Sequence, residues 1–323
     1  SATYFTQIYQ NTGPDNNGDW KLKPYNAELK GIWSGESMWV DFDTDGEQDI
    51  FVCGFEAEPA QLYHNSDGVF TSLYTNLPSV GNAACDWGDY DNDGDMDLAL
   101  IGKSEDNYLT KIYRNDGFVG KVYTFTDIEA NFLQVSSGDI AWGDYDNDGD
   151  IDIVYTGNTG ALTSVTKLYE NANGLFVEKS TPFRDIGRST LAWGDYDGDK
   201  DIDLIISGFS PSLTRPFTGV YRNNHNLPGE LPLTPVKLTS ELQGDDSVLL
   251  SWEPAAVGIG KNHGPLTFNV RIGTEQGESD IYSPLADITT GGRKIAKNGN
   301  TGLSGSWLAS GLTGGQKYYW SVQ

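Results

Sequence analysis

The chain has 323 residues, and 21 Lys and Arg against 46 Asp and Glu give it a formal net charge of −25. So acidic a chain lacks the basic face that binds phosphates, which argues against nucleic acid as a partner. A hydrophobic content of 37%, with 39 Gly and 13 Pro, predicts an all-β protein with many turns and two or three domains.

Four acidic segments with the pattern DxDxDGxxD recur about every fifty residues along the chain. We call them loops 1 to 4 and number their positions 1 to 9. They read DFDTDGEQD from Asp41, DYDNDGDMD from Asp89, DYDNDGDID from Asp144 and DYDGDKDID from Asp195. A Trp stands two residues before each first Asp, and an apolar run ending in Gly follows each loop.

A second signature, Tyr and Asn separated by one residue, alternates with these loops. It reads IYQN from Ile8, LYHN from Leu62, IYRN from Ile112, LYEN from Leu168 and VYRN from Val220. Two signatures in fixed phase are typical of four-stranded propeller blades. We expect a strand into each loop, a second out of it, a third at the Tyr-Asn signature and a weaker fourth such as GVFTSL or GLFVEK. Residues 1–25 supply only the outer part of a blade.

The spacing of the acids predicts a calcium site in each loop. Carboxylates at positions 1, 3 and 5 converge only if the backbone turns sharply, and Gly at position 6 supplies that turn. Position 9 adds a carboxylate and position 7 a carbonyl oxygen. Calcium accepts about six to eight oxygens in flexible geometry, whereas magnesium requires a strict octahedron. We expect about four Ca²⁺ ions, because crowded carboxylates without a cation repel one another or take up protons.

The predicted metal ligands are all the acidic side chains of the four loops: Asp41, Asp43, Asp45, Glu47 and Asp49; Asp89, Asp91, Asp93, Asp95 and Asp97; Asp144, Asp146, Asp148, Asp150 and Asp152; Asp195, Asp197, Asp199, Asp201 and Asp203. Alternatively, Asp, Asn and Gly simply form hairpin turns, but four loops with Asp in register favour the metal.

Loop 4 departs from the pattern, because Lys200 stands at position 6, where the other loops have Gly. A side chain in a left-handed turn costs on the order of 1 kcal/mol. We therefore expect the fourth site to be weaker, although Gly198 can relieve the strain.

These loops, with the WGDYDNDGD and LYRN-like segments, resemble the FG-GAP or VCBS repeats, the calcium-bearing blades of integrin α-subunit propellers and of many secreted bacterial surface proteins. The resemblance covers residues 1–228 and implies an integrin-like β-propeller with calcium on its blade-edge hairpins and a role in adhesion or ligand binding. Such rings normally have about seven blades. We therefore expect part of a longer protein or an assembly, with a smaller or dimerised ring as the alternative.

The composition changes at NNHNLPGELPLTPVKL, where Pro228, Pro232 and Pro235 indicate a stiff linker over residues 229–236. The remaining residues, 237–323, form the second predicted domain.

That domain combines a strand with a buried Trp252, a long alternating strand, and a corner between Leu312 and Tyr318. The order resembles a fibronectin type III β-sandwich. The chain ends at Gln323, within the expected sixth strand, so we expect the sandwich to be C-terminally incomplete or to have an open edge.

The sequence favours a binder over an enzyme. It has no HExxH, GxSxG, Gly-rich phosphate loop or Cys-His pairing. The three histidines, His64, His225 and His263, are scattered. Because other copies of the signature have Arg or Glu in place of His64, we expect an unspecialised surface position there. We predict no catalytic residues and no organic cofactor.

The predicted function is a calcium-stabilised binding or adhesion module with a protein or glycan ligand on a surface or in the extracellular matrix. Sites of this kind need roughly 10⁻⁴ to 10⁻³ M calcium, so we expect a secreted or cell-surface protein. The chain has no run of about 18 apolar residues, so we expect no membrane insertion.

The alternative function is a glycan-binding lectin or an accessory domain of a polysaccharide-active enzyme, for which exposed aromatic residues would be the mark. Trp20, Trp33 and Trp307 lie outside the repeat pattern and are candidates. We expect the four repeat tryptophans to pack between blades instead: Trp39, Trp87, Trp142 and Trp193. For Cys53 and Cys85, a link between adjacent blades is conceivable, but we favour free buried thiols.

Overall fold

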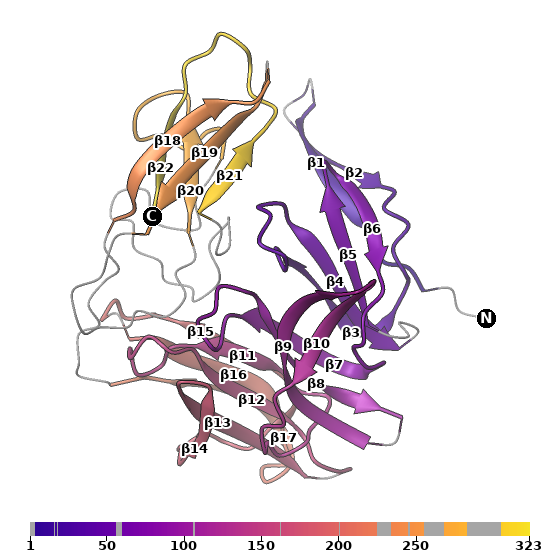
Figure 1. Ribbon diagram of the computed structural model, residues 1–323. Helices are drawn as coiled ribbons and strands as arrows, with labels where there is room; N and C mark the ends of the chain where they lie inside the picture. The colour runs from indigo at the N-terminus through magenta and orange to yellow at the C-terminus, as the bar shows by residue number, and fades with distance from the viewer. Residues whose placement is uncertain are drawn as a thin grey trace.

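The computed structural model describes residues 4–15, 17, 19–55, 60–105, 107–161, 163–199, 201–224, 234–244, 246–254, 268–282 and 305–323. These residues form strands and turns without a helix, as the all-β prediction requires, and so include no helix that could cross a membrane. Their strands form seven open sheets (Figure 1).

Four antiparallel sheets, which we call sheets 1 to 4, each contain the acidic loop of the same number. Sheet 1 consists of β3 (Trp33–Val40), β4 (Asp49–Phe55), β5 (Gln61–Ser66) and β6 (Val69–Leu73). Sheet 2 consists of β7 (Gly81–Gly88), β8 (Asp97–Ser104), β9 (Asn107–Val119) and β10 (Val122–Asp127). Sheet 3 consists of β11 (Ile140–Gly143), β12 (Asp152–Asn158), β13 (Ser164–Ala172) and β14 (Leu175–Lys179). Sheet 4 consists of β15 (Gly187–Gly194), β16 (Asp203–Ser210) and β17 (Arg215–Tyr221).

Within each of these sheets the strand order follows the chain, as predicted. The acidic loop joins the first strand to the second, and its ninth residue is paired with the last residue of the first strand, as in Gly88 opposite Asp97. The first strands of successive sheets contact one another, β3 with β7, β7 with β11, and β11 with β15. The number of blades and the closure of a ring stay predictions.

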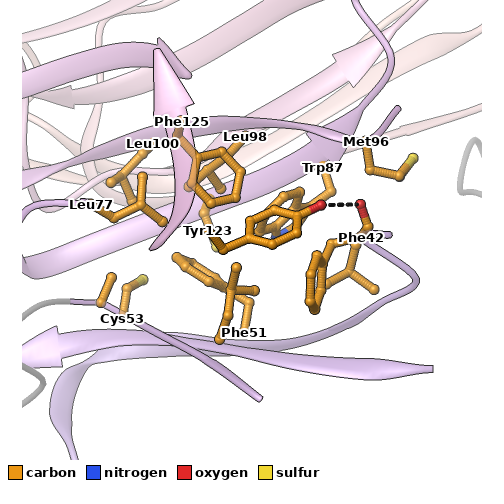
Figure 2. Packing of buried hydrophobic residues seen from close by; sticks show 14 of the residues in the cluster. Phe42, Phe51, Cys53, Leu77, Trp87, Met96, Leu98, Leu100, Tyr123 and Phe125 are labelled. Atoms are coloured by element: carbon orange, nitrogen blue, oxygen red, sulfur yellow. Dashed lines mark hydrogen bonds between the residues drawn. The ribbon is translucent and has the colours of Figure 1, made fainter. Parts of the chain in front are cut away.

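A hydrophobic core lies between sheets 1 and 2 (Figure 2). Phe51 of sheet 1 packs edge-on against Trp87 of sheet 2, with ring centroids 5.3 Å apart. The Tyr123 hydroxyl reaches back and donates a hydrogen bond to the Phe42 carbonyl oxygen at 3.3 Å. Buried aromatic and aliphatic side chains therefore hold the two repeats together, as the repeat pattern predicts.

The glycine of the Trp-Gly-Asp motif permits this close packing between sheets. A Cβ on Gly143 would lie 2.7 Å from Trp193 and 2.8 Å from Ile202, both of the next repeat. No side chain fits there without displacing those residues.

The repeat tryptophans do not all pack between sheets. Trp87, Trp142 and Trp193 are buried as predicted, but Trp39 is 53% exposed. The prediction is wrong for Trp39 because sheet 1 follows the hairpin of β1 (Ile8–Pro14) and β2 (Trp20–Tyr25) instead of a four-stranded sheet. There Trp39 lines a pocket with Ile8 and Leu29.

Both cysteines are free and buried, in agreement with the favoured interpretation. Cys85 lies with its Sγ 3.5 Å from Met38 Sδ, inside the core between sheets 1 and 2. Burial is the first cause that raises the pKa of the Cys85 thiol. An unreactive packing role fits this environment.

The C-terminal strands form two sheets around a core of their own. One contains β18 (Val236–Leu242), β19 (Val248–Glu253) and β21 (Ser306–Ala309); the other contains β20 (Val270–Gly273) and β22 (Tyr319–Val322). Trp252 is buried in this core, as predicted. The Tyr318 hydroxyl accepts a hydrogen bond from the Thr313 N–H at 2.8 Å. Most of the predicted linker, with Pro228 and Pro232, lies outside the described residues.

Candidate metal centres

The backbone of the acidic loops is left-handed at two positions. At position 6, Gly46, Gly94 and Gly149 have φ angles of 93°, 99° and 98°, which suit a residue without a Cβ. Position 4 is left-handed in all four loops, with φ angles of 56°, 62°, 58° and 80° at Thr44, Asn92, Asn147 and Gly198. Gly198 therefore serves position 4. Lys200, on which the predicted weakness of loop 4 rested, lies outside the described residues.

The aspartate at position 1 accepts hydrogen bonds from the backbone of its own loop. Asp89 accepts them from the N–H groups of Asp93 and Gly94 at 3.0 and 2.9 Å, and loop 3 repeats this arrangement. In loop 4, Asp195 accepts a hydrogen bond from the Gly198 N–H at 2.7 Å. The first aspartate thus bonds to the turn of its own loop in loops 2, 3 and 4.

The aspartate at position 9 ties each loop to the third strand of its sheet. Asp97 accepts hydrogen bonds from the N–H groups of Tyr90 at 3.2 Å and Asn115 at 2.8 Å. The other loops repeat both bonds through Asp49, Asp152 and Asp203. These buried carboxylates fix the loops in place.

The aspartate at position 3 keeps an unsatisfied oxygen in loops 1 and 2. Asp43 Oδ1 and Asp91 Oδ1 are buried and have no hydrogen-bond partner. Asp41 Oδ1, at position 1 of loop 1, is in the same state. A buried carboxylate oxygen without a donor is costly, so these oxygens are suited to a bound cation.

The carboxylates of positions 1, 3 and either 5 or 9 converge in every loop, with ligand atoms within 4.8 Å of one another. The converging sets are Asp41, Asp43 and Asp45; Asp89, Asp91 and Asp97; Asp144, Asp146 and Asp152; and Asp195, Asp197 and Asp199. Several clusters of acidic residues could thus bind metal ions, and oxygen-only clusters suit a hard cation such as calcium.

The acidic side chains at position 7 make other contacts, although they were predicted as ligands. Glu47 accepts hydrogen bonds from the Asp67 N–H at 3.1 and 3.0 Å. Asp150 accepts one from the Asn92 amide of loop 2 at 2.9 Å, and Asp201 one from the Asn147 amide of loop 3 at 2.9 Å. The bonds of Asp150 and Asp201 link neighbouring loops. Asp95 is the position 7 residue of loop 2. Burial, and then the like charges of Asp93 and Asp91, raise its pKa.

The position 1 acids are poorly stabilised as anions in loops 1 to 3. Burial raises the pKa of Asp41 to about 7, and nearby carboxylates add to this effect. Burial also raises the pKa values of Asp89 and Asp144 to about 6, although backbone hydrogen bonds oppose it there. Burial also raises the pKa values of Asp97 and Asp152 to about 8. A cation among these groups would relieve that cost, so the residues of loops 1 to 3 fit a bound calcium ion.

Loop 4 has a cation of its own, which was not predicted from the sequence. Arg222 follows the Tyr of the last Tyr-Asn signature, and its Nε and Nη2 lie 2.7 Å from Asp197 Oδ2 and 2.9 Å from Asp199 Oδ2. The hydrogen bond from Arg222 is the first cause that lowers the pKa of Asp199. Loop 4 therefore pairs its position 3 and position 5 acids internally.

Arg114 occupies the same strand position in sheet 2, but it donates hydrogen bonds to an acid of its own strand. Its Nε and Nη2 both bond to Asp116 Oδ1, at 2.9 and 2.8 Å. Sheet 4 has Asn224 in place of Asp116. The residue after the signature Asn, Asp116 in sheet 2 and Asn224 in sheet 4, thus accounts for the different orientation of the two arginines. This difference can be seen in the sequence.

His64 is the equivalent residue in sheet 1, and the prediction of an unspecialised surface position is wrong. Its Nδ1 lies 3.1 Å from Asp43 Oδ2 and 3.5 Å from Asp49 Oδ1. The antiparallel pairing of β4 and β5 brings this strand position beside the loop. His225 and His263 lie outside the described residues.

The Asn of the Tyr-Asn signature holds adjacent repeats together, another role that was not predicted from the sequence. Asn171 Nδ2 donates to the Tyr90 carbonyl of loop 2 at 2.8 Å and to the Ile151 carbonyl of loop 3 at 3.1 Å. Asn115 and Asn223 make the same pair of bonds in their sheets. The fixed phase of the two signatures is explained by these bonds.

The FG-GAP-like repeat pattern matches residues 41–100, 89–155 and 144–206, which together span more than half of the chain. Each match starts at the first Asp of one loop and extends beyond the start of the next. No curated protein matches the chain. Repeats of this kind often bind calcium and are often found in adhesion or binding modules.

Proposed function

The chain belongs to the FG-GAP-like repeat family, and from this premise we propose that it is a calcium-stabilised, non-catalytic binding and adhesion module. The observation that carries the proposal is the set of buried carboxylate oxygens without a hydrogen-bond donor, on Asp41, Asp43 and Asp91. These oxygens stand where acidic side chains converge. A bound cation is the simplest group that satisfies them.

In loops 1 to 3 the side chains at positions 1, 3, 5 and 9 hold the ion in this proposal. Calcium supplies the positive charge that lets the buried acids ionise and locks each loop between two strands. Loop 4 binds calcium more weakly, because an ion there must displace Arg222 from Asp197 and Asp199. The proposed stoichiometry is therefore three tight ions and a weaker fourth.

We assign the protein to the cell exterior or the cell surface, with a protein or glycan ligand. Calcium modules of the exterior work at roughly 10⁻⁴ to 10⁻³ M, a concentration that the cytosol does not reach. The acidic residues of the loops are committed to backbone bonds, to calcium or to Arg222, so they supply no free base or nucleophile for catalysis.

We further propose that residues 237–323 form a fibronectin type III-like spacer next to VCBS-type propeller blades. Two sheets that share a core with Trp252 support this assignment. Trp39, 53% exposed on sheet 1, supports packing against a further chain segment or subunit, because its counterparts Trp87 and Trp142 are covered by a neighbouring sheet.

Glycan recognition is the second candidate function, and exposed tryptophans favour it. Trp20 is 72% exposed, and Trp33 is partly exposed and stacks on Tyr4 with ring centroids 6.0 Å apart. Flat exposed aromatic rings suit the apolar faces of sugars. Trp307 is a weaker candidate, because its ring packs edge-on against Tyr282 at 4.6 Å.

A binding assay tests the proposed function. The purified chain is applied to arrays of glycans and of extracellular-matrix proteins, in calcium and in chelator. We expect saturable binding that chelator abolishes, and no release of sugars from polysaccharide substrates. Turnover of any polysaccharide, or the absence of binding to every member of both arrays, would contradict the proposal. Loss of glycan binding in a Trp20→Ala variant would favour the lectin alternative.

A further inference from the structure

Loop 1 differs from the other three loops because a histidine enters it. His64 Nδ1 lies 3.1 Å from Asp43 Oδ2, 3.5 Å from Asp49 Oδ1 and 4.0 Å from Asp45 Oδ2. Despite these short distances, Nδ1 is buried and has no hydrogen-bond partner in the structure. The nitrogen and the carboxylate oxygens therefore converge at ion-pair distances without the geometry of a hydrogen bond.

Such spacing is that of ligands around one metal ion. With zinc–ligand distances of about 2.0 to 2.2 Å, two ligands at a tetrahedral or right angle are roughly 3.0 to 3.5 Å apart. The separations of His64 Nδ1 from Asp43 and Asp49, 3.1 and 3.5 Å, fall in this range. His64, Asp43 and Asp49 also form a group whose ligand atoms all lie within 4.8 Å of one another.

A second observation concerns the aspartate at position 1 of the same loop. Asp41 is only 4% exposed, and its Oδ1 has no hydrogen-bond partner. Its ligand atom lies within 4.8 Å of those of Asp43 and Asp45. Loop 1 therefore offers an unsatisfied carboxylate oxygen on Asp41 and an imidazole nitrogen on His64, and Asp43 belongs to the converging groups of both.

The nitrogen changes the class of metal that the loop prefers. Oxygen-only sites suit calcium and magnesium, whereas imidazole suits zinc, nickel, copper and iron. The equivalent residues in the other sheets, Arg114, Glu170 and Arg222, offer no neutral nitrogen ligand. We propose that loop 1 is a mixed nitrogen and oxygen site that binds a divalent transition metal of the zinc class, through His64, Asp43 and Asp49, in exchange for calcium.

This inference deepens the proposed function at one loop and does not depend on calcium binding in loops 2 and 3. The chain provides its own controls, because it contains three histidines in all, His64, His225 and His263. His225→Ala and His263→Ala each remove one imidazole outside loop 1. They are the matched partners of a His64→Ala variant.

The test is calorimetric titration of the full chain with ZnCl₂ at saturating calcium. We expect one tight zinc ion per chain in the unchanged protein and in the two control variants, with release of one calcium ion. Zinc affinity should fall at least tenfold in His64→Ala. Unchanged zinc affinity in His64→Ala, or no zinc binding by the unchanged chain, would overturn the proposal.

Two further measurements separate a lost ligand from a lost fold. The rise in melting temperature on adding calcium should persist in His64→Ala, because loops 2 and 3 are intact. His64→Gln, which keeps a polar side chain of similar length, should lose zinc to the same extent, and zinc binding at full strength in that variant would contradict the assignment of the imidazole. If calcium has no effect on any variant but zinc still binds through His64, the calcium proposal fails, whereas the assignment of His64, Asp43 and Asp49 as zinc ligands stands.

Discussion

Loops 2 and 4 have aspartates at the same five positions, yet they balance the charge in different ways. In loop 2, Asp91 keeps a buried oxygen without a donor, and burial raises the pKa of Asp89 to about 6. In loop 4, Arg222 bonds to the acids at positions 3 and 5. The same acidic pattern therefore favours binding of an external cation in loop 2, whereas in loop 4 it forms an ion pair with an arginine of the chain.

Removing calcium should have the largest effect, because it acts on loops 1, 2 and 3 together. At a hundredfold excess over Kd, each site adds about 2.7 kcal/mol of stability, and for a chain of this size about 1 kcal/mol shifts Tm by roughly 2 to 4 °C. Thermal melts in millimolar calcium and in chelator should thus differ by more than about 10 °C. Superimposed melting curves would refute calcium stabilisation.

Removing one position 5 acid should separate the two kinds of loop. Asp148→Ala should delete one tight calcium ion and about 2.7 kcal/mol of calcium-dependent stability. Asp199→Ala, the matched change in loop 4, should leave the tight ions unchanged, because Arg222 occupies that carboxylate. Equal losses of tight calcium in both variants would show that loop 4 is an ordinary site.

The calcium-free protein should become less stable as the pH rises. Burial raises the pKa values of Asp97 and Asp152 to about 8 and that of Asp86 to about 7. The pKa of each of these carboxyl groups is higher in the folded state than in the unfolded state. The stability that their protonated forms contribute is therefore complete below about pH 4, and it is lost as the pH rises through the folded-state pKa values.

Melts in chelator between about pH 6 and pH 9 measure this loss, and Tm should fall across the range. The rise in Tm on adding calcium should grow over the same range, because calcium binds the ionised acids. A Tm in chelator that increases from pH 6 to pH 9 would contradict the claim that burial raises the pKa values of these carboxyl groups in the calcium-free protein.

The smallest effect should come from exchanging the residues that orient the two arginines. Asp116→Asn should free Arg114 from its bonds at 2.9 and 2.8 Å and weaken calcium binding at loop 2. Asn224→Asp should draw Arg222 out of loop 4 and tighten calcium binding there. We expect changes of about tenfold in Kd, or about 1.4 kcal/mol, measured by calorimetric titration. Changes in the same direction for both variants would refute this role.

The sequence was sufficient to predict the features that depend on short-range spacing. The sheet strands, the left-handed glycines at position 6 and the convergence of acids at positions 1 and 3 follow from residues within one repeat. The burial of Trp87 and Trp142 also follows, because equivalent residues of successive repeats meet in the same way.

The features that the sequence did not predict depend on contacts between repeats or between strands. Asn171 joins carbonyls from two loops, and Arg222 reaches loop 4 only through the pairing of β16 and β17. Trp39 is exposed because its neighbour along the chain is a two-stranded hairpin. At position 7, Asp150 and Asp201 accept hydrogen bonds from side-chain amides of the preceding loop, Asn92 and Asn147.

The comparison of the loops is tested most directly by the number of calcium ions that the chain binds. Calorimetric titration of chelator-treated protein, checked by native mass spectrometry, should give three tight ions for the unchanged chain and a fourth at least about tenfold weaker. Arg222→Ala should bring the fourth ion to an affinity close to that of the others. Four equivalent sites in the unchanged chain, or none, would contradict the account.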